Sequence, residues 1–192
     1  MAKVADDLYI GGDTPEELLG TWEKVLSALQ RCDLNLSAAK TIIAPKCTSI
    51  LGWIWELGTI RANPHRVSTL SALRTPTNVS GMLSFIGAYK VLARVIKGSA
   101  SLMAPLYDVV AGRDSKELIV WTDELRSSFK KSQDASSTNC SITLPRAADQ
   151  LWIVTDGSVK NLGLGATLYV TRGSRVLLAG FFSAKLRKNQ VN

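Results

Sequence analysis

The first apolar positions of the chain alternate around a pair of acids. Residues 4 to 10 predict a strand, a tight turn and a second strand, with Ala5 and Leu8 flanking Asp6 and Asp7. Two glycines follow and end the element. The sequence therefore places the two adjacent carboxylates at or beside the turn of a short hairpin.

A helix is predicted next, because the spacing of the apolar positions changes to three and four residues. Thr14 is the expected N-cap, Pro15 suits the first helical position, and Glu17 completes a Thr-x-x-Glu capping box. The expected apolar stripe consists of Leu18, Trp22, Val25 and Leu29, widened by Leu19 and Leu26.

Short β-like runs follow from residue 34, in "LNLSAAKTIIA" and "SILGWIWELGTI", interrupted by Pro45 and Gly58. Trp53 and Trp55 are two residues apart, so in a strand they share one face. The two aromatics suit a core or a cross-strand ladder. The alternative is a strand that lies against the backbone of a ligand.

The section "RTPTNVSGMLSFIGAYKVLARVIKG" predicts a helix with Thr77 or Asn78 as its N-cap and Gly98 as its end. Lys90, Arg94 and Lys97 fall at i, i+4 and i+7, which places three cations on one helical face. This face is either a solvated stripe or a surface that follows a phosphate backbone.

The last third of the chain predicts one more helix and then a sheet. "ELIVWTDELRSSFKKSQ" indicates a helix entered at Thr122, and the polar "DASSTNCS" reads as a connector and domain boundary. "QLWIVTDGS", "GATLYV" and "RVLLAGFF" then predict a β-meander with one face left uncovered.

Composition indicates a folded protein, since 46% of the 192 residues are hydrophobic. No apolar stretch approaches the roughly 20 residues that span a bilayer, and no signal peptide is recognisable. We expect an intracellular, cytoplasmic, soluble protein without a membrane partner. Cys32, Cys47 and Cys140 form no disulfide or zinc pattern, and the single His65 has no metal-binding neighbour in the sequence.

Charge is unevenly distributed along the chain, which carries a net charge of +7. Residues 1–60 contain five Lys/Arg and eight Asp/Glu, residues 61–115 contain seven and two, and residues 116–192 contain eleven and six. A basic region of this kind is typical of nucleic-acid-binding proteins, because cations displace counterions from phosphates.

Carboxylates at two places suggest metal chemistry, although each also has a simpler explanation. Asp6 and Asp7 suit a turn, and Asp156 after the apolar "LWIV" suits a strand end. Brought together by a sharp bend, carboxylates suit Mg²⁺ or Mn²⁺, and two such ions can assist a phosphoryl transfer. A carboxylate pair alone seldom holds two ions, so at least one further acid is expected.

The order of these elements resembles one family. "VADDLYIGG", "LNLSAAK", "LGWIWELGTIRANPHRV", "TPTNVSGMLSFIGAYKVLARVIKGSASLMAPLYDVV", "WTDELRSSF" and "VTDGSVKNLGLGATL" with "FFSAKL" occur in the order seen in Pol polyproteins of long-terminal-repeat retrotransposons. The chain is most similar to the BEL/Pao type, from late reverse transcriptase into early RNase H. The resemblance covers nearly the whole chain.

The resemblance implies roles for particular residues. Asp6 and Asp7 would bind metal at the polymerase site, Lys40 would protonate the departing pyrophosphate, and Asp156 would be the first metal-binding acid of RNase H. Residues expected to contact nucleic acid are Leu51, Gly52 and Trp53 in a primer-gripping hairpin, and Lys90, Arg94 and Lys97 in the thumb. The implied partners are an RNA or DNA template-primer, an RNA–DNA hybrid, deoxynucleotides and the remainder of the Pol polyprotein.

The implied fold is α/β (α+β) in pieces: a reverse transcriptase palm remnant (1–60), a thumb and connection (61–133), and an incomplete RNase H-like sheet (142–192). The fingers, the first palm aspartate and the later RNase H acids are missing, so we expect the isolated chain to be inactive. The alternative is a non-catalytic nucleic-acid-binding remnant of a degraded or co-opted retroelement. Virus-like particles are a possible location within the cytoplasm.

Overall fold

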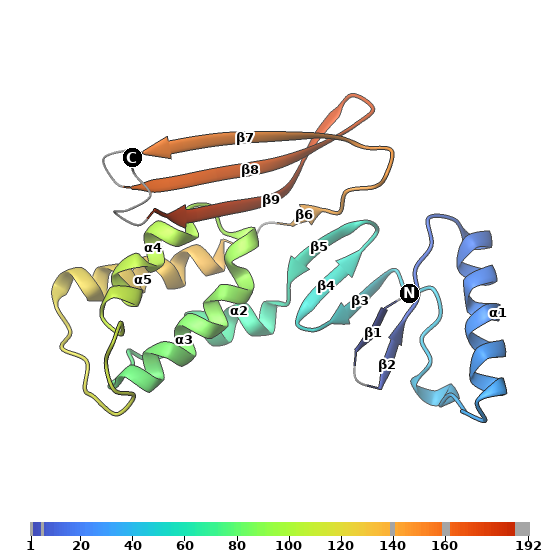
Figure 1. Ribbon diagram of the computed structural model, residues 1–192, viewed down its shortest axis with the longest axis horizontal. Helices are drawn as coiled ribbons and strands as arrows, with labels where there is room; N and C mark the ends of the chain where they lie inside the picture. Colours follow the sequence, from blue (N-terminus) through green and yellow to red (C-terminus); the bar gives the residue numbers. More distant parts are fainter. Residues whose placement is uncertain (1, 5, 139–140, 159–161, 187–192) are drawn as a thin grey trace. The chain divides into compact units, whose positions relative to one another are not determined.

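The computed structural model describes the chain except residues 1, 5, 139–140, 159–161 and 187–192. It contains both helices and open antiparallel sheets, which confirms the expected mixed α+β class (Figure 1). The chain forms two compact units, Met1–Pro45 and Lys46–Asn192. Each unit is described by itself.

The first unit begins with the predicted hairpin and helix. Strands β1 (Ala2–Val4) and β2 (Asp7–Tyr9) pair antiparallel, with Val4 opposite Asp7. Helix α1 (Pro15–Arg31) starts at Thr14, whose Oγ1 accepts the N–H of Glu17 at 3.1 Å. The carboxylate of Glu17 accepts the N–H of Asp13, one residue before the N-cap, at 2.9 Å. The four main members of the predicted apolar stripe are buried or half-buried, which confirms them. The expected widening by Leu19 and Leu26 is wrong, because both side chains are exposed.

The strand expected within "LNLSAAKTIIA" is not formed. A single 3₁₀ turn, η1 (Ala38–Lys40), occupies its centre, and both the N–H and the hydroxyl of Thr41 bond back to residues 37 and 38. Ile42 and Ile43 are 73% and 76% exposed. These local hydrogen bonds take the place of a strand ladder, so the β-like composition of this run was misleading.

A small antiparallel sheet opens the second unit. Its strands are β3 (Cys47–Ile50), β4 (Trp53–Glu56), β5 (Thr59–Ala62) and β6 (Ile142–Thr143), in that spatial order. The first three are joined by two-residue turns, Leu51-Gly52 and Leu57-Gly58, in which both residues have positive φ. This combination is typical of the tight turns whose twist matches that of a hairpin.

Helices α2 (Pro64–Ser71), α3 (Val79–Leu92), α4 (Ser99–Asp108) and α5 (Asp123–Ser137) build the main core. The predicted N-caps Asn78 and Thr122 are confirmed, since their side chains accept the N–H groups of Gly81 and Leu125. Fully buried apolar side chains of α3 meet Phe129 of α5, whose ring lies 4.5 Å from that of Phe85. The core continues onto β5 and β6 through Ile60, Ala62 and Ile142.

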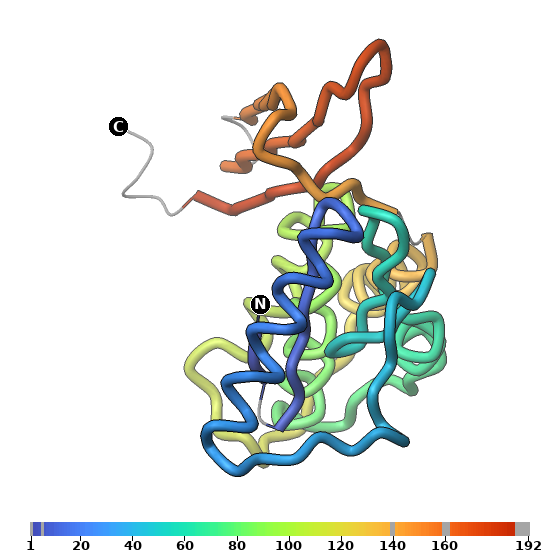
Figure 2. The backbone as a smooth tube through the Cα atoms, turned by 90° about the vertical axis from the view of Figure 1, so that its right-hand side faces the viewer, coloured from blue at the N-terminus to red at the C-terminus, as the bar shows by residue number. Residues whose placement is uncertain are grey.

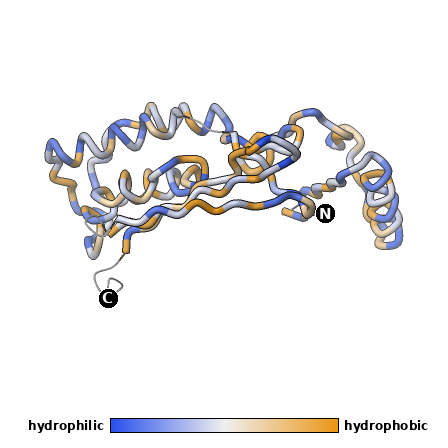
Figure 3. The backbone as a smooth tube through the Cα atoms, turned by 90° about the horizontal axis from the view of Figure 1, so that it is seen from above, coloured by the Kyte–Doolittle hydropathy of each residue, from blue (hydrophilic) through white to orange (hydrophobic). Residues whose placement is uncertain are grey.

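The predicted β-meander is also confirmed. It consists of β7 (Gln150–Ser158), β8 (Gly163–Arg172) and β9 (Arg175–Lys185), paired antiparallel in sequence order. Strand β9 lies against α4 and the 3₁₀ turn η2 (Ala93–Val95), as Figures 1 and 2 show. Strand β7 is an edge strand, and its successive apolar residues 151–154 are all at least 52% exposed, so both of its faces are open. Figure 3 shows the hydropathy of each residue along the backbone, with hydrophobic positions in orange.

The boundaries predicted from sequence remain predictions. Strand β5 spans the expected division at residue 60, and the short β6 at the start of the expected third domain pairs with β5. Helix α5 continues to Ser137, so the predicted connector begins inside it. Among the described residues, no helix has both the length and the apolar character required to cross a bilayer.

Candidate nucleic-acid interface

Asp6 and Asp7 lie at the turn of the first hairpin, as the sequence predicted. Asp6 is in the turn and Asp7 opens β2, and both are exposed. The Tyr9 hydroxyl lies 3.4 Å from the Asp7 carboxylate and donates to it. Partial desolvation, together with the negative charge and hydrogen bond of Asp7, raises the pKa of Tyr9. The hairpin thus presents two carboxylates to solvent, one of which already has a hydrogen-bond partner.

Carboxylate oxygens are the ligands that Mg²⁺ prefers, so the donor chemistry of the Asp6-Asp7 hairpin fits a divalent ion. These two carboxylates alone are too few to complete a metal site. Across the described part of the chain, no group of three or more His, Cys, Asp or Glu side chains is placed to hold a metal ion. Lys40, the predicted general acid, is exposed at the end of η1 in the same unit.

Leu51 and Gly52 form the tip of the β3–β4 hairpin, and Leu51 is 63% exposed. The carbonyl of Gly52 accepts the N–H of Asn63, the residue that caps α2, at 3.0 Å. Trp53 begins β4 opposite Ile50 and packs its half-buried ring against the core. Leu51 is therefore accessible to a ligand, whereas Gly52 is half-buried and the side chain of Trp53 is engaged within the protein.

Arg66 of α2 reaches the same turn, and the sequence analysis did not single it out. A Cβ atom built on Gly52 would lie 2.5 Å from Cζ of Arg66 and 2.7 Å from its Nε. The guanidinium thus occupies the space that glycine leaves open. The available signal was the basic residue before Val67 in "NPHRV", which the resemblance had included without assigning it a role.

Lys90, Arg94 and Lys97 do not share one helix, which corrects the expected geometry. Helix α3 ends at Leu92, Arg94 belongs to η2, and Lys97 lies in the turn before α4. The reason is packing, because Leu92, Val95 and Ile96 are all buried and the change to 3₁₀ geometry directs them inward. All three cations are exposed, and the Lys90 ammonium lies 5.3 Å from the ring centre of Tyr107. Their contact with nucleic acid stays a prediction.

Asp156 lies within β7, two residues before the strand ends, and pairs with Gly165 of β8. It is exposed on the edge strand. The strand continues beyond Asp156 to Ser158, so this residue does not end the strand, as the simpler explanation had expected. A metal-binding role for Asp156 stays a prediction.

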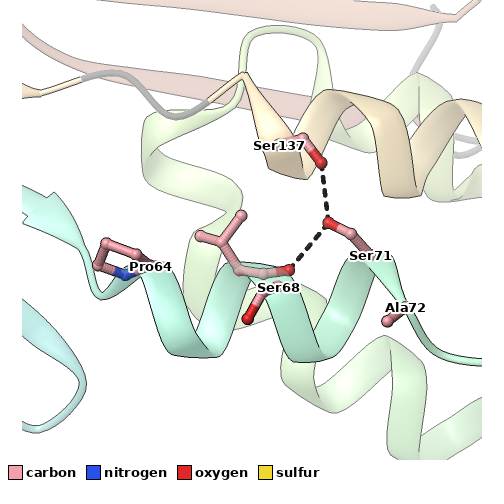
Figure 4. A pocket seen from close by; sticks show the side chains of 6 residues that line it. Pro64, Ser68, Ser71, Ala72 and Ser137 are labelled. Carbon is pink, nitrogen blue, oxygen red and sulfur yellow. Dashed lines mark hydrogen bonds between the residues drawn. The ribbon is translucent and has the colours of Figure 1, made fainter.

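Two shallow grooves flank α2. One, between α2 and α5, is lined by three apolar residues and three serines, and Oγ of Ser71 lies 2.8 Å from Oγ of Ser137 (Figure 4). The other, of about 390 Å³, lies between α2 and α3 and includes Arg66 in its lining. None of the site residues predicted from sequence lines either groove.

Comparison of the sequence with known proteins finds no matching family model. Among curated proteins, the chain is 27% identical over 147 residues to the Gag-Pol polyprotein of woolly monkey sarcoma virus, covering 76% of this chain and 8% of that protein. It is 23% identical over 197 aligned positions to a retrovirus-related Pol polyprotein from the Drosophila melanogaster transposon opus, covering 97% and 19%. It is 29% identical over 120 residues to the Pro-Pol polyprotein of simian foamy virus type 1, covering 62% and 10%.

The chain is related to retroviral and retrotransposon Pol polyproteins. It is similar to their reverse transcriptase and RNase H region, which confirms the resemblance inferred from sequence. The chain spans less than a fifth of the length of these Pol relatives. Assignment to the BEL/Pao type stays a prediction.

Solved structures of Pol proteins share the fold. The foamy viral protease-reverse transcriptase dRH, in complex with double-stranded DNA, aligns with a TM-score of 0.78 and 15% identity over 94% of this chain and 31% of that one. The foamy viral protease-reverse transcriptase in complex with an RNA/DNA hybrid aligns with a TM-score of 0.75 and 14% identity over 94% and 24%. At this identity the likeness is one of fold.

Proposed function

We propose that this chain is part of an RNA-directed DNA polymerase with RNase H activity, acting by phosphoryl transfer on nucleic acid. The observation that carries the proposal is the likeness of 94% of the chain to a reverse transcriptase fold, with Asp6-Asp7 on an exposed hairpin turn. The partners proposed are a template-primer, an RNA–DNA hybrid, deoxynucleotides and the rest of a Pol polyprotein. The excess of basic residues after position 60 supports nucleic-acid binding.

In the polymerase reaction, the primer 3′-hydroxyl attacks the α-phosphorus of a deoxynucleotide, and pyrophosphate leaves. Asp6 and Asp7 would supply carboxylate oxygens to hold Mg²⁺ or Mn²⁺, and such an ion would offset the charge that develops on the phosphate. Lys40 gives a proton to the departing pyrophosphate. Asp156 contributes one carboxylate to the hydrolysis of RNA in a hybrid.

The isolated chain is proposed to be inactive, because a carboxylate pair and a single carboxylate each bind divalent ions weakly. The test is template-primed deoxynucleotide incorporation by the purified chain, compared with Asp6→Asn and with the parent Pol protein. We expect no incorporation by the chain, and loss of incorporation when the same substitution is made in the parent. Incorporation by the wild-type chain that Asp6→Asn abolishes would overturn the proposed inactivity.

Nucleic-acid binding is tested separately by fluorescence anisotropy with a labelled RNA–DNA hybrid over a series of salt concentrations. We expect binding that weakens with salt, and a further loss when Lys90, Arg94 and Lys97 are all changed to Glu. A triple variant that binds like the wild type would remove these residues from the interface. Salt-independent binding would contradict phosphate recognition altogether.

The second candidate function is a non-catalytic nucleic-acid-binding remnant. This candidate is favoured by the small number of metal ligands at each position, because the described residues bring no three His, Cys, Asp or Glu side chains together. The genomic sequence on both sides distinguishes the two candidates. An upstream reading frame that encodes the fingers and the first palm aspartate supports the polymerase, whereas a promoter and stop codon at these ends support the remnant.

A further inference from the structure

Arg66 of α2 is a half-buried cation beside an exposed turn, and its charge has no partner among the residues that the structure describes. It takes part in none of the hydrogen bonds or ion pairs formed among the described residues. A guanidinium has five N–H donors and remains charged at any physiological pH. A charged group that is partly withdrawn from water is favoured when a counter-charge is supplied from outside.

The stretch of sequence on either side of Arg66 contains no carboxylate. Between Glu56 and Asp108 the chain contains six Lys or Arg residues and no Asp or Glu. This interval includes β5, α2 and α3. Helix α5, which also packs against α2, carries Asp123, Glu124 and Asp134, and none of them forms an ion pair with Arg66. The stretch of chain around Arg66 thus carries positive charge only.

The guanidinium lies directly against the Leu51-Gly52 turn. Gly52 has a φ of 79° and no side chain, and Nη2 of Arg66 would lie 2.8 Å from a Cβ built there. The N–H of Asn63 donates to the carbonyl of Gly52, so the start of α2 and the turn are joined. Arg66 also lines the groove between α2 and α3, which makes it accessible from solvent.

We propose that Arg66, seated on Gly52, binds a backbone phosphate of a nucleic-acid strand that passes the β3–β4 turn. This inference rests on the proposed function and adds a specific residue to it. The planar fork of arginine matches two oxygens of a phosphodiester, and the turn restricts its orientation before binding. Gly52 is required because any larger side chain there would displace the guanidinium, in addition to its role in the turn.

The test uses fluorescence anisotropy of the full chain with a labelled RNA–DNA hybrid over a salt series. We expect Arg66→Gln to weaken binding by about fivefold to tenfold and to reduce the slope of log affinity against log salt by about one. Arg66→Lys keeps the positive charge but loses the paired donors of the guanidinium. It should therefore retain most of the salt dependence of binding while binding more weakly than the wild type. The matched control is Arg74→Gln, an exposed arginine of the loop after α2, with no ion pair to another described residue.

The contact between the guanidinium and Gly52 is tested with Gly52→Ala, because a methyl group at this position would displace the guanidinium. We expect Gly52→Ala to weaken binding in the wild-type background and to have a much smaller effect when Arg66 is already Gln. Far-UV circular dichroism shows whether each variant is folded. Equal effects of Gly52→Ala in both backgrounds would contradict the seating of Arg66 on the turn.

Two failures are distinguishable in these measurements. If the wild-type chain does not bind the hybrid, the proposed function is overturned, and this inference with it. If the wild type binds but Arg66→Gln keeps the same affinity and salt slope as Arg74→Gln, only the phosphate contact is overturned. Loss of hybrid binding on adding a deoxynucleoside triphosphate, seen in the wild type but not in Arg66→Gln, would assign Arg66 to a free nucleotide instead and also overturn it.

Discussion

Ser183 of strand β9 caps helix α4 through the backbone N–H of Ala100. Its Oγ lies 2.8 Å from the nitrogen of Ala100 and 3.0 Å from Oγ of Ser99. The residue at the N-cap position of α4 is Gly98, which has no side chain to serve this purpose. The meander therefore satisfies a helical N–H that the local sequence leaves open, and this contact connects β9 to the helical part of the unit.

Replacing Ser183 by Ala should destabilise the second unit by about 1 kcal/mol, the usual effect of losing a helix cap. Urea unfolding followed by tryptophan fluorescence measures the change. Ser174→Ala in the exposed β8–β9 turn is the control and should have little effect. Equal stability of the two variants would show that the cap contributes nothing measurable.

Gln133 of α5 donates hydrogen bonds to backbone carbonyls at the C-terminal end of α2. Its side-chain Nε2 donates to the carbonyls of Leu70 and Leu73 at 3.1 and 2.8 Å, and the residue is buried. Gln133→Met preserves the volume but removes both donors, so we expect a loss of about 2 kcal/mol. Urea unfolding measures the loss, and hydrogen exchange should show faster exchange in α2.

The control for Gln133 is Lys131→Met, because Lys131 is exposed on the same helix. It should change the free energy of unfolding by less than about 0.5 kcal/mol. If Gln133→Met unfolds at the same urea concentration as the control, the two hydrogen bonds do not stabilise the α2–α5 contact.

Asp149 should make the second unit sensitive to acid. Its carboxylate receives two hydrogen bonds from Arg172, at 2.9 and 2.6 Å, and one from the N–H of Arg146. The hydrogen bonds from Arg172 are the main cause that lowers the pKa of Asp149 from 3.8 to about 2. Because the folded state favours the ionised carboxylate, its stabilisation is complete above the ordinary pKa and is lost as the pH falls towards about 2.

Asp149→Asn should therefore lower stability near neutral pH, and its difference from the wild type should shrink in acid. Urea unfolding at a series of pH values measures this. Asp108→Asn removes an exposed carboxylate that lies 3.5 Å from Lys185, and it should change stability little at any pH. A constant difference between Asp149→Asn and wild type across the acid range would contradict the prediction.

Tyr9 reports on the ionised Asp7 carboxylate. Desolvation and Asp7 both raise the pKa of Tyr9, so Asp7→Asn should lower it by removing the negative charge and the ionised acceptor. Spectrophotometric titration of tyrosinate measures the shift, with Tyr9→Phe identifying the signal of this residue. Asp13→Asn, an exposed acid outside the hairpin, is the control. An unchanged Tyr9 titration in Asp7→Asn would mean that the two side chains do not interact in solution.

Elements predicted correctly from sequence depend on interactions between near neighbours. The caps at Thr14, Asn78 and Thr122 each involve a bond across three residues. The first hairpin and the meander join consecutive strands. The placement of Asp6 and Asp7 on a turn follows from the same local rules, and the order of the motifs was enough to relate the chain to Pol polyproteins.

Interactions across longer distances could not be predicted in this way. Ile142 pairs with Ile60 to complete a sheet, and Ser183 caps a helix that begins 84 residues earlier. The helix expected to carry Lys90, Arg94 and Lys97 ends at Leu92, and the 3₁₀ turn that follows directs the side chains of Val95 and Ile96 into the core. The β-like run before Pro45 finds no partner strand and forms a turn instead.

The sequence by itself determined the local elements and the chemistry available at each position, because capping, turn formation and side-chain periodicity act over a few residues. The tertiary structure alone decided that the guanidinium of Arg66 rests on Gly52 of a distant turn. It also decided that Trp53 packs inward while Leu51 remains accessible. These arrangements depend on which surfaces meet when the core forms, and no local pattern specifies that.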